Sequence, residues 1–301
     1  MLSNQVMLTS AITLACALGI GFYMQASSPR WAGDAVAASD PQLPDEPESA
    51  ELKIENITLT SSPAETAPAA AEPQPAVPAQ PASCRMTASA EAAPIAMVSL
   101  TVTAPCHGGE RLTVHHSGMS FTVSLDPTGR YAAQVPALTR TAVYIAETAS
   151  GGGTVAVAEV AGVEAMERVV LQWSGHSGLE MHAREFGAEY GSAGHVWHGA
   201  APGAAAGQVV RLGDPSLLAP RIAEIYSVPA SQPERFGTVS LTAEAEVTGL
   251  NCGREISAQA LQLRGGRLSS NDLVVAMPDC DAQGSFLVLN NLLEDLKIAA
   301  N

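Results

Sequence analysis

Histidines are the first residues of this sequence whose type suits chemistry. Imidazole is a common zinc ligand and proton carrier, and one short stretch holds four such side chains: His176, His182, His195 and His198. Their spacing is unsuited to joint chelation. On a strand, His195 and His198 point to opposite faces, and the glycines that flank them disfavour a helix. We therefore expect surface or loop histidines, and predict no metal-binding residues.

Two other patterns match a known motif only in part. One matches the first positions of an EF-type calcium loop, at Asp279, Asp281, Gln283 and Gly284. Its twelfth position is Asn290 and not the bidentate glutamate that calcium requires. Residues 175–178 place a histidine beside a serine, where the two side chains diverge, and Gly-x-Ser-x-Gly is absent. We predict no catalytic residue and no cofactor, and expect that the protein is not an enzyme.

A third stretch has side chains suited to recognition. Aromatic and charged residues stand among glycines at Arg184, Glu185, Phe186, Tyr190, His195 and Trp197. Aromatic side chains with charged neighbours on a loop are typical of recognition surfaces. These residues form our candidate recognition loop. The alternative, which we prefer, is that Phe186 and Trp197 pack in the core.

The elements that must position these residues are predicted to be short antiparallel strands. Polar and apolar residues alternate over 97–102, 111–116 and 119–125, and turns rich in Gly and Pro separate these runs. Strands at such regular intervals indicate a β-sandwich. We assign residues 84–163 to a first β-sandwich unit.

Residues 164–301 are predicted to form a second β-sandwich-like unit. Its long alternating runs, 237–247 and 255–263, are expected as central strands, with Glu244, Glu246, Gln259 and Gln262 on one wet face. Residues 187–207 are rich in Gly and Ala and are predicted to be loops. The tail, 291–300, has a helix-like spacing of leucines.

Four cysteines outside the N-terminal apolar run suggest disulfides. Their number permits three connectivities. We pair Cys84 with Cys106 and Cys252 with Cys280, because each pair then lies within one predicted unit. Disulfides belong to oxidising compartments such as the bacterial periplasm.

The N-terminal apolar run is long enough to cross a membrane. It begins at Val6, ends at Met24 and has no charged residue. As a helix it would reach about 28 Å, close to the hydrocarbon core of about 30 Å. We predict a transmembrane signal-anchor over residues 1–29, with a cleaved secretory signal as the alternative.

Residues 30–83 are rich in Pro, Ala and acidic side chains, and are predicted to be a disordered linker. Residues 52–60 interrupt it with alternating apolar side chains, which could add a strand to a partner or pack on the chain's own downstream domain. The fold class expected for the whole chain is thus all-β, with an N-terminal transmembrane helix, a disordered linker and two β-sandwich-like units.

The charge of the chain excludes one class of partner. Its 30 acidic and 15 basic residues leave a formal net charge of -15. Nucleic-acid backbones require basic stripes, so we predict no nucleic-acid partner.

We expect a single-pass inner-membrane protein with most of the chain in the periplasm, and an envelope protein as its partner.

Several stretches resemble a known group of sequences. Residues 17–22, 182–191, 211–215 and 279–296 are similar to an uncharacterised group of membrane-anchored envelope proteins from alphaproteobacteria. The likeness covers the anchor and both β units, but not the linker. Members of the group often carry the label translocase, and no catalytic residue follows from the resemblance.

The function expected from these observations is binding. We predict a membrane-anchored periplasmic binding or scaffold protein without a catalytic site. One alternative is an accessory subunit of an envelope or translocation assembly, which an anchor and tether would hold at high local concentration. The other is a periplasmic hydrolase that uses the histidine-rich loops.

Overall fold

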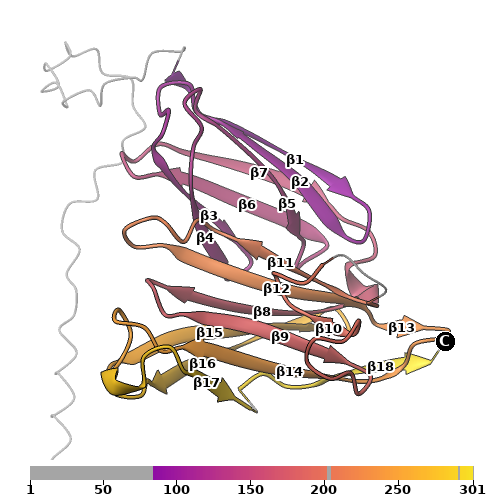
Figure 1. Ribbon diagram of the computed structural model, residues 1–301. Helices are drawn as coiled ribbons and strands as arrows, with labels where there is room; N and C mark the ends of the chain where they lie inside the picture. The colour runs from indigo at the N-terminus through magenta and orange to yellow at the C-terminus, as the bar shows by residue number, and fades with distance from the viewer. Residues whose placement is uncertain (1–83, 202–204, 291, 301) are drawn as a thin grey trace, which may run out of the picture. The chain divides into compact units, whose positions relative to one another are not determined.

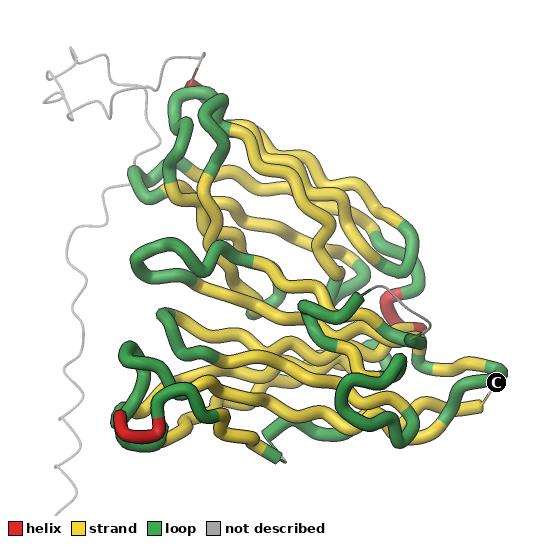
Figure 2. The backbone as a smooth tube through the Cα atoms, in the orientation of Figure 1, coloured by secondary structure: helices red, strands yellow, loops and turns green. Residues whose placement is uncertain are grey.

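The described part of the chain is almost entirely β-structure. The computed structural model describes residues 84–201, 205–290 and 292–300, and Figure 1 shows their strands arranged in successive sheets. Besides strands it contains loops and short 3-10 helices, among them Val163–Ala165 and Cys280–Ala282, as Figure 2 shows. The all-β prediction is confirmed for these residues. The predicted anchor and linker lie outside them.

The first seven strands form two sheets that share a core. The first sheet has the order β1–β2–β5 and contains β1 (Thr87–Ala93), β2 (Met97–Thr103) and β5 (Arg130–Pro136). The second has the order β4–β3–β6–β7 and contains β3 (Arg111–His116), β4 (Met119–Ser124), β6 (Thr141–Thr148) and β7 (Gly153–Glu159). Because β2 pairs with β5 and β3 with β6, the connections are those of an immunoglobulin-like Greek key. We call these strands the first sandwich.

The remaining strands form a second pair of sheets. The inner sheet has the order β11–β12–β8–β15–β16 and contains β8 (Met166–Ser174), β11 (Gln208–Leu212), β12 (Arg221–Pro229), β15 (Glu255–Arg264) and β16 (Arg267–Ala276). The outer sheet has the order β10–β9–β14–β18–β13, with β17 also paired to β14. Its strands are β9 (Leu179–Glu185), β10 (His195–Val196), β13 (Ser231–Gln232), β14 (Gly237–Glu246), β17 (Phe286–Leu289) and β18 (Leu296–Ala300).

Each face of the inner sheet contributes to a core. On one face Val170 and Ile225 belong to the core of the first sandwich, and on the other Leu171 and Tyr226 pack against the outer sheet. Consecutive apolar residues in β8 and β12 are therefore all buried, as expected for strands between two layers. Burial of each such side chain contributes about 2 kcal/mol.

Arg168 of β8 joins the first sandwich to the inner sheet. Its side chain is fully buried. Nε donates to Ser227 Oγ at 3.1 Å, Nη2 donates to the carbonyl of Ile95 at 2.7 Å, and Nη1 donates to the carbonyl of Ala137. Burial lowers the pKa of the guanidinium to about 10, so it stays charged at neutral pH. The Arg168 guanidinium thus satisfies one carbonyl in the connection between β1 and β2 and one in the connection between β5 and β6.

Both predicted disulfides are present. Cys84 is bonded to Cys106 and Cys252 to Cys280, which confirms the local pairing. Because such bonds persist in oxidising surroundings, they indicate a non-cytoplasmic compartment. No helix among the described residues is long and apolar enough to cross a membrane.

Two expectations about the second half were wrong. Residues 296–300 form strand β18 on β14 and not a helix, because pairing satisfies the backbone groups of β14 while so short a helix is unstable alone. Glu244 and Gln259 do not share a wet face, since β14 and β15 belong to different sheets. The connection between them, 247–254, carries the chain from the outer to the inner sheet.

Candidate functional site

The loop region between β9 and β11 is held at both ends by a buried carboxylate. Glu185 is 4% exposed, and it accepts the N–H groups of Ala206 and Gly207, each at 2.6 Å, and the hydroxyl of Tyr226 at 2.8 Å. Only glycine fits at 207, because a Cβ there would lie 2.6 Å from the Tyr226 hydroxyl oxygen. Glu185 is therefore a structural anchor for the loop.

Two histidines that the sequence separates are in direct contact. His182 Nδ1 lies 2.8 Å from His195 Nε2, and the N–H of Gly191 donates to His195 Nδ1 at 3.0 Å. Since His195 Nδ1 accepts, its proton is on Nε2 and is donated to His182 Nδ1. The proton of His182 is then on Nε2. Burial lowers the pKa of both histidines, which agrees with two neutral rings.

The protonated nitrogen of His182 faces two carboxylates. Glu180 and Glu244 are opposite each other on β9 and β14, where like charges repel. His182 Nε2 lies 3.9 Å from Glu180 and 3.7 Å from Glu244. The Tyr190 hydroxyl donates to Glu244 at 2.5 Å. This hydrogen bond and the nearby imidazole N–H offset the repulsion.

A third carboxylate, Glu224, belongs to the same network of histidines and carboxylates, at the edge of the outer sheet. Glu224 of β12 is fully buried and accepts the N–H of Met181 at 2.6 Å. Since β10 pairs only with residues 183 and 184 of β9, Glu224 replaces the missing strand there. Its other oxygen lies 3.2 Å from His198 Nδ1 and 3.5 Å from Arg211 Nη1, and the hydrogen bond to Glu224 raises the pKa of His198.

The structure divides the candidate recognition loop into two groups. Arg184 lies over the ring of Tyr190 at 5.0 Å, and Trp197 stacks on His182 at 5.7 Å, so these side chains gather with His195 in one cluster. Tyr190 is 48% exposed. Glu185 is buried instead, and Phe186 packs against the core between the inner and outer sheets.

The hydrogen bonds within this cluster fix the positions of its side chains and leave few side-chain atoms free for catalysis. Both ring nitrogens of His195 are engaged, and His182 Nε2 carries its proton, which leaves no lone pair for a metal ion. Within residues 84–201, 205–290 and 292–300, no group of three or more His, Cys, Asp or Glu side chains is arranged to hold a metal. Beside the cluster is a pocket of about 490 Å³, lined mainly by small apolar side chains together with Trp197 and His198.

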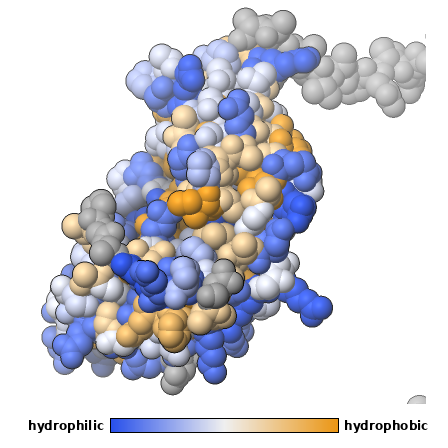
Figure 3. Space-filling view, turned by 90° about the vertical axis from the view of Figure 1, so that its right-hand side faces the viewer, coloured by the Kyte–Doolittle hydropathy of each residue, from blue (hydrophilic) through white to orange (hydrophobic). Residues whose placement is uncertain are grey.

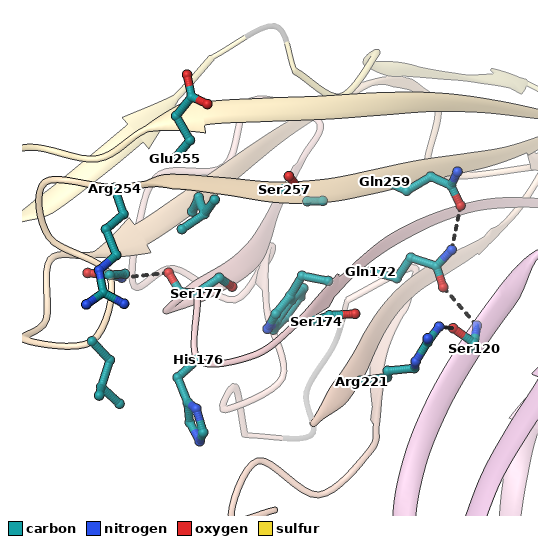
Figure 4. Close-up of a pocket in the computed structure, with 15 residues that line it drawn as sticks. Ser120, Gln172, Ser174, His176, Ser177, Arg221, Arg254, Glu255, Ser257 and Gln259 are labelled. Carbon is teal, nitrogen blue, oxygen red and sulfur yellow. Dashed lines mark hydrogen bonds between the residues drawn. The ribbon is translucent and has the colours of Figure 1, made fainter. Parts of the chain in front are cut away.

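A second site, which the sequence analysis missed, is a cleft of about 540 Å³ on the inner sheet beside β4. The first sandwich covers Val170 and Leu261 on this face of the sheet, while the cleft exposes the next positions along the same strands. Figure 4 shows its polar lining, which includes Ser120, Gln172, Ser174, Arg221, Ser257 and Gln259. The sequence feature that could have indicated the cleft is the alternation of polar residues 172 and 174 with the buried Leu171 and Trp173.

Apolar side chains also reach the surface, in patches among hydrophilic ones (Figure 3). On β6 and β7, Val143 is paired with Val157 and Ile145 with Val155, and the four side chains are 39% to 56% exposed. We call these residues the apolar quartet. Exposed patches of this kind often mark contacts between proteins.

Comparisons with known proteins identify no family for the chain. No protein-family model matches it, and no curated protein sequence does. Among solved structures it is similar to a chicken TCR, at 7% identity over 64% of this chain and 97% of that one, with a TM-score of 0.17. It is also similar to a Ca²⁺-stabilized adhesin by which an Antarctic bacterium binds ice, at 13% identity over 72% and 74%, with a TM-score of 0.19. Such scores do not indicate a shared fold.

Proposed function

We propose that this chain is a non-catalytic binding protein of the cell envelope, held at the inner membrane by the run from Val6 to Met24 and facing the periplasm. The disulfides support an oxidising location. The length and apolar character of the N-terminal run support the anchor. The resemblance to alphaproteobacterial envelope proteins agrees with both.

The cleft on the inner sheet carries this proposal. Its exposed side chains include Ser174, His176, Arg254 and Ser257, and none of them has a hydrogen-bond partner in the described part of the chain. The strands beneath are interior strands of the sheet, with β8 between β12 and β15. A rigid wall with unpartnered polar groups suits a ligand that supplies the missing partners.

Photocrosslinking in the native envelope tests the proposal. The variant Ser257→p-benzoylphenylalanine places the probe in the cleft, and we expect a reproducible adduct. A matched probe at Thr238, which is exposed on the outer sheet, should give none. Equal labelling from both positions, or none from position 257, would contradict a ligand site in the cleft.

An accessory subunit of an envelope assembly is a second candidate, favoured by the apolar quartet. Four β-branched side chains on neighbouring strands expose a surface that a protein partner would bury. The same experiment with the probe at Val155, which is 56% exposed, should then capture a protein. If position 155 gives no adduct, the quartet is an ordinary solvated surface.

The hydrolase alternative gains no support from the histidines. A general base needs a free ring nitrogen near its substrate, whereas His195 uses both nitrogens within the network. His198 is similarly placed between Glu180 and Arg211.

A further inference from the structure

The floor of the cleft excludes binding by strand addition. It is the face of the inner sheet, where β8 is paired with β12 over 166–174 and with β15 over 168–173, and β15 is paired with β16 over 255–264. Residues 255–257 of β15 are not in register with β8, but β15 is still an interior strand of the sheet and has no free edge. A peptide that adds as a strand needs a free sheet edge. A ligand here must therefore be held by side chains.

Part of the polar lining is fixed in advance by a chain of hydrogen bonds. The N–H of Ser120 donates to Gln172 Oε1 at 2.8 Å, Gln172 Nε2 donates to Gln259 Oε1 at 2.7 Å, and Gln259 Nε2 donates to Asp272 Oδ1 at 2.7 Å. These side chains are oriented before any ligand arrives, which lowers the entropy cost of binding. The hydroxyls of Ser174 and Ser257, in contrast, remain available on the exposed floor.

Three charged residues line the cleft, and two of them, Arg221 and Arg254, are cationic. Arg221 contacts only the hydroxyl of Ser120 through its guanidinium, at 3.3 Å, and Arg254 has no side-chain partner in the described part of the chain. Figure 4 shows Arg254 and His176 at the same end of the cleft, and the Glu255 carboxylate directed away from them. Both guanidinium groups are therefore open to a carboxylate of a ligand, whereas Arg140 and Arg264 are already paired with Glu164 and Glu294.

We infer that the cleft binds an acidic oligosaccharide, with hydroxyls of the sugar on Ser174 and Ser257 and its carboxylates on Arg221 and Arg254. This inference rests on the proposed function. Guanidinium groups bind carboxylates in bidentate geometry, and serine hydroxyls both donate to and accept from sugar hydroxyls. The cleft volume of about 540 Å³ lies within the usual range for small-molecule sites.

Calorimetry with the full-length protein in nanodiscs tests the ligand class. The probes are trigalacturonate and the neutral galactotriose, which differ in the carboxylates. We expect trigalacturonate to bind at least about tenfold more tightly, a difference that one good ionic contact supplies. Its affinity should also fall when the salt concentration rises from about 50 mM to about 300 mM, because salt screens exposed charges.

Paired variants locate the contact. The double variant Arg221→Gln/Arg254→Gln should lose about tenfold in trigalacturonate affinity. The control Arg267→Gln removes another exposed arginine, at the start of β16, which has no carboxylate partner among the described residues. This variant should bind as the unchanged protein does. Circular dichroism melting checks that all variants are folded.

The outcomes separate this inference from the proposed function. Equal affinity for the two probes, or full binding by the double variant, overturns the assignment to carboxylates and arginines. If neither probe binds while position 257 still crosslinks a ligand in the envelope, the acidic oligosaccharide is wrong and the binding function stands. If both experiments are negative, both proposals fail.

Discussion

Several buried polar side chains in this protein satisfy particular backbone groups. Glu185 holds two loop amides, Glu224 holds the free amide of Met181, and His116 joins the connection between β5 and β6 to strand β6. A buried polar group that lacks a partner costs about 1–3 kcal/mol. The fold therefore depends on these residues, and the groups that they contact determine their protonation states.

His116 should make the protein sensitive to acid. It is 1% exposed, its Nε2 accepts the N–H of Leu138 at 2.9 Å, and its Nδ1 donates to the carbonyl of Val143 at 3.0 Å. Burial lowers the pKa of His116 from 6.5 to about 4, so the unfolded chain binds the proton more tightly. Stability from this residue is complete above pH 6.5, and about 3 kcal/mol is lost as the pH falls toward 4.

Urea unfolding across this pH range measures the effect. The variant His116→Gln keeps one donor and one acceptor but does not titrate, so its free energy of unfolding should fall less steeply with acid. Parallel pH profiles for the two proteins would show that His116 does not carry the proton linkage.

The two histidines of the network should each be held as one tautomer. We expect His182 and His195 to be protonated on Nε2 and unprotonated on Nδ1, because the chain of donors starts at the N–H of Gly191. Long-range ¹H–¹⁵N correlation spectra report this directly. His176, which is exposed and makes no hydrogen bond with the described residues, is the control and should show averaged tautomers. An Nδ1–H signal from His195 would contradict the arrangement.

At the scale of elements, the inner sheet organises the described chain. Its strands β8 and β12 are buried on both faces and have continuous apolar runs, while β9 and β14 of the outer sheet present one face to the network of histidines and carboxylates. Arg168 is the polar exception within β8, because it reaches the connections of the first sandwich.

Removing Arg168 should loosen the contact between the first sandwich and the inner sheet. In Arg168→Met the carbonyls of Ile95 and Ala137 lose their donors, and we expect the free energy of unfolding to fall by about 2–4 kcal/mol. The control is Arg140→Met, whose arginine is 65% exposed and should change stability by less than about 1 kcal/mol. Equal losses in chemical denaturation would rule out a special role for the buried arginine.

At the scale of the whole molecule, the cleft exists because coverage is incomplete. The first sandwich packs on part of one face of the inner sheet, and the uncovered part of that face is the polar floor. The disulfide Cys252–Cys280 lies beside this floor, since Asn251 and Arg254 both line the cleft.

Both disulfides should contribute similarly to stability. The bonded cysteines are separated by 22 and 28 residues, and closing loops of this size in the unfolded chain is worth about 3 kcal/mol each. The variants Cys84→Ala/Cys106→Ala and Cys252→Ala/Cys280→Ala should each lose about this much in thermal or urea unfolding. Only the second pair should also weaken ligand binding. A loss of binding from the first pair instead would contradict the position given to the cleft.

Local patterns in the sequence determined much of the fold. The alternation in residues 97–102 and 111–116 predicted β2 and β3, because side chains of a strand point to opposite faces in turn. The disulfide pairing followed from the predicted units, because each pair of cysteines lies within one of them. In the described residues 187–201 and 205–207, the expectation of mostly loops is confirmed, and the two-residue strand β10 is the single strand among them.

Only the tertiary structure decided which strands are neighbours and which faces are covered. No sequence pattern predicted a strand where β12 lies, because a strand buried on both faces shows no alternation. His182 and His195 are thirteen positions apart in the chain, whereas the pairing of β9 with β10 brings His182 Nδ1 to 2.8 Å from His195 Nε2. The cleft was equally hidden, because whether Ser174 and Ser257 meet solvent depends on where the first sandwich ends. Strand formation is local and can be read from neighbouring residues, whereas sheet order and coverage depend on contacts between distant ones.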